Sequence, residues 1–126
     1  AVYGLLPGAG ASVRLPERIG MARAKYLMFS GAEFPPTSPH LAGLVNAVFP
    51  AEQLMPEVTD IVANIAKRSR PGLRRMKHLL HMAPHLSREA ALRNELAVNE
   101  AHLHSGDMAE GLRAFENKQT PDFRDE

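Results

Sequence analysis

The sequence has 126 residues, of which 44% are hydrophobic and 23% charged, a composition typical of a single globular domain. A formal net charge of +1 gives the chain no general attraction to nucleic acids or membrane surfaces. The absence of cysteine excludes disulfides, thiolate metal sites and a cysteine nucleophile, and no stretch approaches the roughly 18 apolar residues that span a bilayer.

Residues 1–15 predict a short apolar strand followed by a glycine-rich turn. The opening letters are AVYGLLPGAGAS. Their spacing matches neither the P-loop pattern GxxxxGK[ST] nor the dinucleotide-binding pattern GxGxxG. The small side chains still allow the backbone of this turn to approach a ligand closely.

A first helix is predicted to begin near Pro16, because proline is tolerated in the first turn of a helix, and to end at Gly31. Apolar residues recur within it at spacings of three and four, which predicts one buried face. They are Ile19, Ala22, Tyr26 and Phe29.

Prolines mark the next segment, FPPTSP, as a loop. Ser38 is placed to cap a single helical turn over 39–42, which Gly43 closes. The following letters LVNAVF, residues 44–49, are short and rich in β-branched side chains, so they predict a second strand that Pro50 ends.

The rest of the chain is predicted to be helical. A wide apolar stripe over 52–69 indicates one helix, and Pro71 begins another that Pro84 breaks. Ser87 caps a long helix that ends at Gly106. About two-thirds of the chain is thus expected to be helix, and two isolated strands cannot form a stable sheet alone.

The last helix is predicted to begin at a capping box. Asp107 precedes Glu110 by three residues, the spacing of that motif, and Pro121 ends the helix.

Three blocks of sequence resemble the C-terminal half of the crotonase superfamily, the enoyl-CoA hydratase/isomerase family. They are GLLPGAGASVRLPERIGMARAKYLMFSG, AGLVNAVFPAEQL and EGLRAFENKQTPDF, and they occur in the family's order and at its usual spacing. The resemblance implies an α/β fold of the ClpP/crotonase-like spiral type. Residues 1–49 would form the end of the spiral core, and 50–126 a mostly helical oligomerisation region.

The resemblance also implies a function. Family members stabilise a thioester enolate with two backbone amides, while glutamates move protons. The substrates are acyl-CoAs, so coenzyme A enters as part of the substrate and no separate cofactor is expected. The assembly is expected to be a homotrimer or a dimer of trimers, with a separate N-terminal half as one alternative. The expected compartment is the cytoplasm, or the mitochondrial matrix in a eukaryote.

Four residues match substrate-binding positions of the family. Leu5 matches a wall of the acyl pocket, and Gly8 the glycine beside the reacting carbon. Phe115 and Lys118 match the F-x-x-K of the last helix, which can reach the CoA of a neighbouring subunit, where lysine acts as a point charge against phosphate. Taken alone, Leu5 and Phe115 are typical core residues and Lys118 a solvated charge.

No catalytic residue is assigned within the sequence, because both matching carboxylates and the oxyanion-hole segment would lie upstream of Ala1. We therefore expect the isolated chain to be inactive. The alternatives are a non-catalytic oligomerisation module or truncated pseudoenzyme. The reaction subtype is left open by several departures from the family pattern. These are Ala11, Ser12, Gln119 and the stretch EFPPTSPHLAG.

The segment KRSRPGLRRMKH, residues 67–78, carries six lysines and arginines. It could bind the phosphates of CoA or of nucleic acid, and a basic nucleic-acid-binding helical domain is the weakest alternative. A solvated face is favoured, because acidic residues elsewhere balance the charge and no aromatics interleave for base stacking.

Three histidines recur at helical spacing, but they do not predict a metal site. Pro84 interrupts the helix before the third of them, and no carboxylate lies close in sequence. They are His78, His81 and His85.

Overall fold

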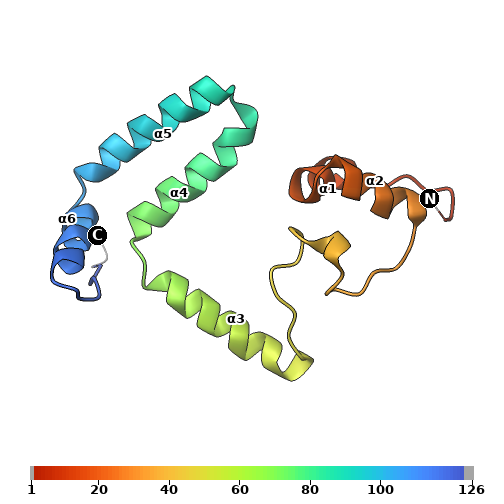
Figure 1. Ribbon diagram of the computed structural model, residues 1–126, viewed down its shortest axis with the longest axis horizontal. Coiled ribbons are helices and arrows are strands. Elements are labelled where there is room, and N and C mark those ends of the chain that lie inside the picture. The colour runs from red at the N-terminus through yellow and green to blue at the C-terminus, as the bar shows by residue number, and fades with distance from the viewer. Residues whose placement is uncertain (1, 124–126) are drawn as a thin grey trace. The chain divides into compact units, whose positions relative to one another are not determined.

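The computed structural model of the chain describes residues 2–123 (Figure 1). The chain divides into two compact units, Ala1–Glu57 and Val58–Glu126. Within the described residues the regular structure is helical throughout. The boundary predicted at residues 49 and 50 remains a prediction.

The first unit contains a pair of helices, α1 (Ala11–Ile19) and α2 (Met21–Ser30), where the sequence predicted one. Gly20 separates them with φ 82° and ψ 155°, a non-helical conformation that only glycine adopts easily. The predicted start near Pro16 was also wrong. The helix begins five residues earlier at Ala11, and Pro16 lies inside it.

The buried part of the first unit is small and lies where the two helices meet. Ile19 is 7% exposed and Ala24 is 1% exposed. Gly43 packs on the end of α1, where an added Cβ would lie 2.8 Å from the carbonyl oxygen of Arg18. Arg23 donates a hydrogen bond of 3.3 Å to the carbonyl of Ala42, which holds the same loop against α2.

The predicted single turn after the proline loop is confirmed. A 3-10 helix, η1, spans Pro39–Leu41, and the side chain of Ser38 accepts a hydrogen bond from the amide of His40. Three rings gather beside it, with centroid separations of 4.8 to 5.8 Å. They belong to Tyr26, Phe34 and His40.

Neither segment predicted as a strand forms one. Residues 5–8 and 46–49 are irregular, and the only pairing between described residues is an isolated bridge between Ala42 and Val45. A strand is stabilised by hydrogen bonds to a neighbouring strand, and no second extended segment within the described part of the chain pairs with either one.

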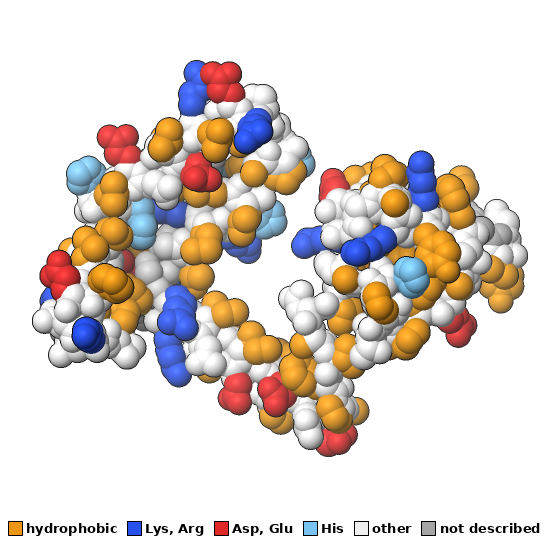
Figure 2. All heavy atoms as spheres, viewed as in Figure 1, with side chains coloured by type: hydrophobic (Ala, Val, Ile, Leu, Met, Phe, Trp, Pro, Cys, Tyr) orange, Lys and Arg blue, Asp and Glu red, His pale blue; other side chains and the backbone are white. Residues whose placement is uncertain are grey.

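Helix α3 (Ala51–Ala66) exposes its apolar stripe. Met55 is 67% exposed and Val62 56% exposed, and no residue of this helix is buried. Figure 2 shows hydrophobic side chains on the visible surface of α3, interspersed with acidic ones. The sequence pattern is that of a core-facing helix, but its apolar face has no cover among the described residues.

The second unit begins within α3 and continues with α4 (Arg70–Met82), a 3-10 turn η2 (Ala83–His85), α5 (Arg88–Leu103) and α6 (Gly106–Glu116). Helices α4 and α5 lie side by side and run in opposite directions (Figure 1). The break predicted at Pro84 is confirmed, because the proline lies in the turn η2 that joins them.

Serine side chains cap α4, α5 and α6. Ser69 accepts from the Gly72 amide at 2.9 Å, and Ser87 accepts from the Ala90 amide at 3.2 Å. Ser105 accepts from the Met108 amide at 3.3 Å, so the prediction that Asp107 caps α6 was wrong. Asp107 lies instead in the first turn of α6, where a carboxylate is favourable to the helix dipole.

Candidate functional site

The segment before α1 contains two of the predicted site residues, Leu5 and Gly8, and Gly8 begins its turn. The Ala11 amide donates to the Gly8 carbonyl at 3.0 Å, and the two residues between them, Ala9 and Gly10, have φ of 53° and 79°. Positive φ at both central positions is the pattern of a type I′ turn. The turn directs the chain into α1, whose N-cap Gly10 makes no side-chain capping bond.

Gly8 and Gly10 differ in backbone conformation, because Gly10 has a positive φ and Gly8 does not. Gly10 has φ 79°, where a side chain is disfavoured, so glycine at this position serves the turn. Gly8 has no positive φ, and an added Cβ would meet nothing within 4 Å among the described residues. The described structure therefore gives no conformational or packing reason for glycine at position 8.

Leu5 is 73% exposed and packs into no core of the first unit. The chain around it, residues 5–8, has no regular structure. An apolar side chain in this state is available to line a pocket wall, the role that the resemblance implies for it.

The last turn of α6 contains Phe115, and the turn that follows the helix contains Lys118, the other two predicted residues. Phe115 is 81% exposed. Lys118 lies in the left-handed region with φ 53°. Its amide donates to the Phe115 carbonyl at 3.2 Å, and the Gln119 amide donates to the Ala114 carbonyl at 2.9 Å. These two bonds form a Schellman motif, whose left-handed position is normally glycine.

A hydrogen-bond network around Arg113 fixes the chain on both sides of Lys118. Its Nε and Nη2 donate to the two oxygens of Glu110, each at 2.7 Å. The same carboxylate accepts from the Asp122 amide at 2.9 Å, and Asn117 donates to the Arg113 carbonyl at 2.7 Å. The segment after α6 is thus folded back onto the helix.

Hydrogen bonding to Glu110, with the attraction between the two charges, raises the pKa of the Arg113 guanidinium above its ordinary value. The Arg113 guanidinium is therefore charged at any physiological pH. Sequence reasoning read Glu110 as part of a capping box and missed this bidentate pair, although its i, i+3 spacing is a usual signal for an ion pair on a helix.

The structure brings the predicted residues together in two pairs. Leu5 and Gly8 lie in the segment before α1 in the first unit. Phe115 lies in the last turn of α6, and Lys118 lies just after this helix, in the second unit. Their assigned roles in substrate binding stay predictions.

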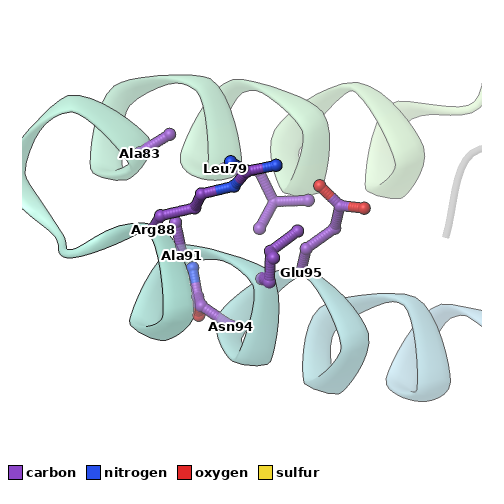
Figure 3. Close-up of a pocket in the computed structure, with 7 residues that line it drawn as sticks. Leu79, Ala83, Arg88, Ala91, Asn94 and Glu95 are labelled. Carbon is purple, nitrogen blue, oxygen red and sulfur yellow. The ribbon is translucent and has the colours of Figure 1, made fainter.

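A hollow of about 280 Å³ lies between α4 and α5 near their connecting turn. Figure 3 shows Arg88 and Glu95 projecting from α5 toward α4, with Leu79 of α4 between them. The remaining lining is Ala83, Ala91, Leu92 and Asn94, of which only Asn94 is polar. A second hollow, of about 350 Å³, lies on the same helix pair and is lined by the basic side chains of α4.

Sequence reasoning also missed a polar contact that joins α4 to α5. Arg75 Nη1 lies 2.6 Å from His102 Nδ1, and Ser105 Oγ lies 3.2 Å from the same nitrogen. Arginine is only a donor, so Nδ1 accepts this bond. No local pattern signals a pair 27 residues apart in sequence.

Within residues 2–123, no three histidine, aspartate or glutamate side chains are grouped so that they could hold a metal ion. No helix of the described chain is both long and apolar enough to cross a membrane.

Comparison with known proteins decides the family. The family model described as enoyl-CoA hydratase/isomerase matches residues 1–126. The chain belongs to this family. The crotonase-family resemblance of the three sequence blocks is thereby confirmed.

Two curated relatives illustrate the match. The chain is 30% identical to 2,3-dehydroadipyl-CoA hydratase of Escherichia coli over 121 residues, which cover 96% of this chain and 48% of the relative. It is 32% identical to a probable enoyl-CoA hydratase of Mycobacterium tuberculosis over 120 residues, covering 95% of this chain and 47% of the relative. The chain thus spans about half the length of these relatives.

Solved structures of the family agree with the fold. An enoyl-CoA hydratase from Bacillus anthracis superposes with a TM-score of 0.87 at 31% identity, covering 99% of this chain and 48% of that one. One from Geobacillus kaustophilus gives 0.86 at 29% identity, covering 98% and 48%. The helices described above are therefore arranged as part of a crotonase fold.

Proposed function

We propose that this enoyl-CoA hydratase/isomerase family chain contributes to an acyl-CoA-processing enzyme. In this proposal Leu5 and Gly8 line the acyl pocket, and Phe115 and Lys118 contact the CoA moiety of a substrate held by a neighbouring subunit. The thioester enolate would be stabilised by backbone amides, with carboxylates as acid and base.

The observation that carries the proposal is the backbone conformation of Lys118. It occupies the left-handed position of a Schellman motif with φ 53°, where a side chain costs about 1 kcal/mol and glycine costs almost nothing. Backbone strain of this kind is concentrated at functional positions. A lysine held there against its conformational preference is consistent with selection for its charge, which suits a CoA phosphate.

Gly8 also supports the proposal, because it is a glycine at a position where the backbone does not require one. No positive φ requires glycine there, and a Cβ would meet only open space. Glycine at this position is consistent with close approach of a ligand that the described residues do not supply.

The test is CoA binding to the 126-residue chain, measured by isothermal titration calorimetry. Lys118→Gly should weaken binding several-fold while raising the melting temperature, because it removes both the charge and the backbone strain. Lys118→Arg should retain binding, and Lys25→Gln, at an exposed position of α2, serves as a charge-matched control outside the motif and outside the basic segment. If Lys118→Gly left CoA affinity unchanged, Lys118 would have no role in binding.

Assembly and compartment belong to the same proposal. We propose a homo-oligomer, a trimer or a dimer of trimers, because the CoA-contacting pair would then serve a neighbouring subunit. We propose the cytoplasm as its location, or the mitochondrial matrix in a eukaryote. One relative, from Dictyostelium discoideum, is named as a mitochondrial probable enoyl-CoA hydratase.

A second candidate function is a non-catalytic oligomerisation module. Exposed apolar helix faces favour it: Leu80 is 71% exposed and Leu96 69% exposed, and burial of each leucine would contribute about 1.5–3 kcal/mol to association. Light scattering separates the candidates when it is combined with the CoA titration. An oligomer that does not bind CoA would favour the module, and a monomer would count against it.

A further inference from the structure

Several side chains of the basic segment 67–78 line a hollow between α4 and α5. Between Asp60 and Glu89 the chain has no acidic residue but seven lysines and arginines. Three basic side chains from α4 line a hollow of about 350 Å³ against α5, and no carboxylate lines it. The lining residues are Arg74, Arg75, His78, Ala97, Val98 and Ala101.

One arginine of this hollow is held in place before any ligand arrives. Arg75 is partly buried and its Nη1 donates to His102 Nδ1 at 2.6 Å, which orients the guanidinium. A guanidinium fixed in this way loses less side-chain entropy when its remaining N–H groups bind an oxyanion.

The other two basic side chains are available for a ligand. Arg74 and His78 are exposed, and neither forms a side-chain hydrogen bond or ion pair with another described residue. They follow each other at i and i+4 on one face of α4, and Arg75 is adjacent to Arg74 in sequence. Together these groups supply donors for the three terminal oxygens of a phosphate.

The α5 side of the hollow is apolar. Ala97, Val98 and Ala101 of α5 form it, and their short side chains leave room beside the cations. This wall suits an apolar or aromatic group next to the anionic one. A purely inorganic ion would leave it unused.

We propose that this hollow binds a phosphate monoester of an apolar or aromatic alcohol. Arg74, Arg75 and His78 hold the phosphate, and the α5 wall contacts the organic group. The site is distinct from the proposed CoA-contacting pair at the end of α6, and it does not depend on the proposed acyl-CoA function. In this proposal, part of the basic segment 67–78 binds a ligand, whereas the sequence favoured a solvated face.

The test uses phenyl phosphate as the probe, titrated into the isotope-labelled 126-residue chain and followed by NMR. The amide signals of Ala97, Val98 and Ala101 should shift, and inorganic phosphate should bind more weakly. Arg74→Gln should weaken binding about tenfold, equivalent to about 1.4 kcal/mol. His78→Asn should weaken it by a smaller factor, and circular dichroism checks that both variants keep their helices.

Lys77→Gln is the matched control, because it removes the same charge from the same helix outside the hollow. If Lys77→Gln and Arg74→Gln weakened binding equally, the attraction would be the diffuse field of α4 and the site would be overturned. Displacement of phenyl phosphate by duplex DNA at low micromolar concentration would also overturn the proposal, since the segment would then be a nucleic-acid surface.

Discussion

The guanidinium of Arg75 on α4 contacts the imidazole of His102 on α5, with Nη1 and Nδ1 separated by 2.6 Å. Ser105, the N-cap of α6, lies 3.2 Å from the same imidazole nitrogen and donates through Oγ to the His102 carbonyl at 2.7 Å. One partly buried histidine therefore connects three helices of the second unit.

This relationship predicts energetic coupling between Arg75 and His102. Each of the variants Arg75→Gln and His102→Leu should lower the free energy of unfolding, and the double variant should cost less than the sum. The coupling should be about 1 kcal/mol, the usual net value of one such hydrogen bond. Urea titrations of the four proteins measure it, with Arg74→Gln as a control that loses no hydrogen bond. Strict additivity would show that the contact contributes nothing.

Lys118→Gly should stabilise the chain. Glycine removes the cost of φ 53° at the left-handed position of the Schellman motif, a gain of about 1 kcal/mol. Thermal unfolding should show a rise of a few degrees in the melting temperature. Asn117→Gly is a useful comparison, because Asn117 directly precedes Lys118, has φ −87° and donates to the Arg113 carbonyl, so glycine there should lower the melting temperature. A lower melting temperature for Lys118→Gly would contradict the conformational argument.

Alanine should be tolerated at Gly8 and not at Gly43. At Gly43 the backbone has φ 92°, and an added Cβ would lie 2.8 Å from the Arg18 carbonyl oxygen, so the loop must move away from α1. We expect a loss of about 1–3 kcal/mol there and no loss at Gly8. The two free energies of unfolding, compared in urea, check this contrast. Equal losses of stability would show that a Cβ at Gly8 does meet neighbouring atoms, which would contradict the open space around this residue.

Ser105→Ala should destabilise the second unit by about 1–2 kcal/mol. The substitution removes the cap of α6 and the contact with the imidazole of His102 at once. Hydrogen exchange should rise at the Met108 amide, which loses the Ser105 Oγ acceptor at 3.3 Å and keeps only the Ser105 carbonyl at 3.1 Å. Ser12→Ala is the matched control, because Ser12 lies in the first turn of α1, which has no side-chain cap. Unchanged exchange at Met108 would rule out the capping role.

Local chemistry explains which parts of the fold were predictable. Pro84 ends a helix because proline lacks an amide donor, and Ser69 and Ser87 cap helices because their oxygens reach nearby amides. The same kind of local reasoning failed at Gly20, where the apolar spacing continues across the break but the backbone turns to φ 82°. It failed again for residues 44–49, because a strand depends on a partner that periodicity does not supply.

For the site, the sequence by itself determined the family, through three motif blocks, and the identity of four matching residues. Only the tertiary structure decided that Lys118 has a left-handed backbone and that Gly8 lies in open space. The Arg75–His102 contact likewise arises from the register of two antiparallel helices. Motifs, caps and the Schellman bonds at Lys118 depend on residues a few positions apart, whereas the Arg75–His102 contact depends on how two helices pack together whose contacting residues are 27 positions apart.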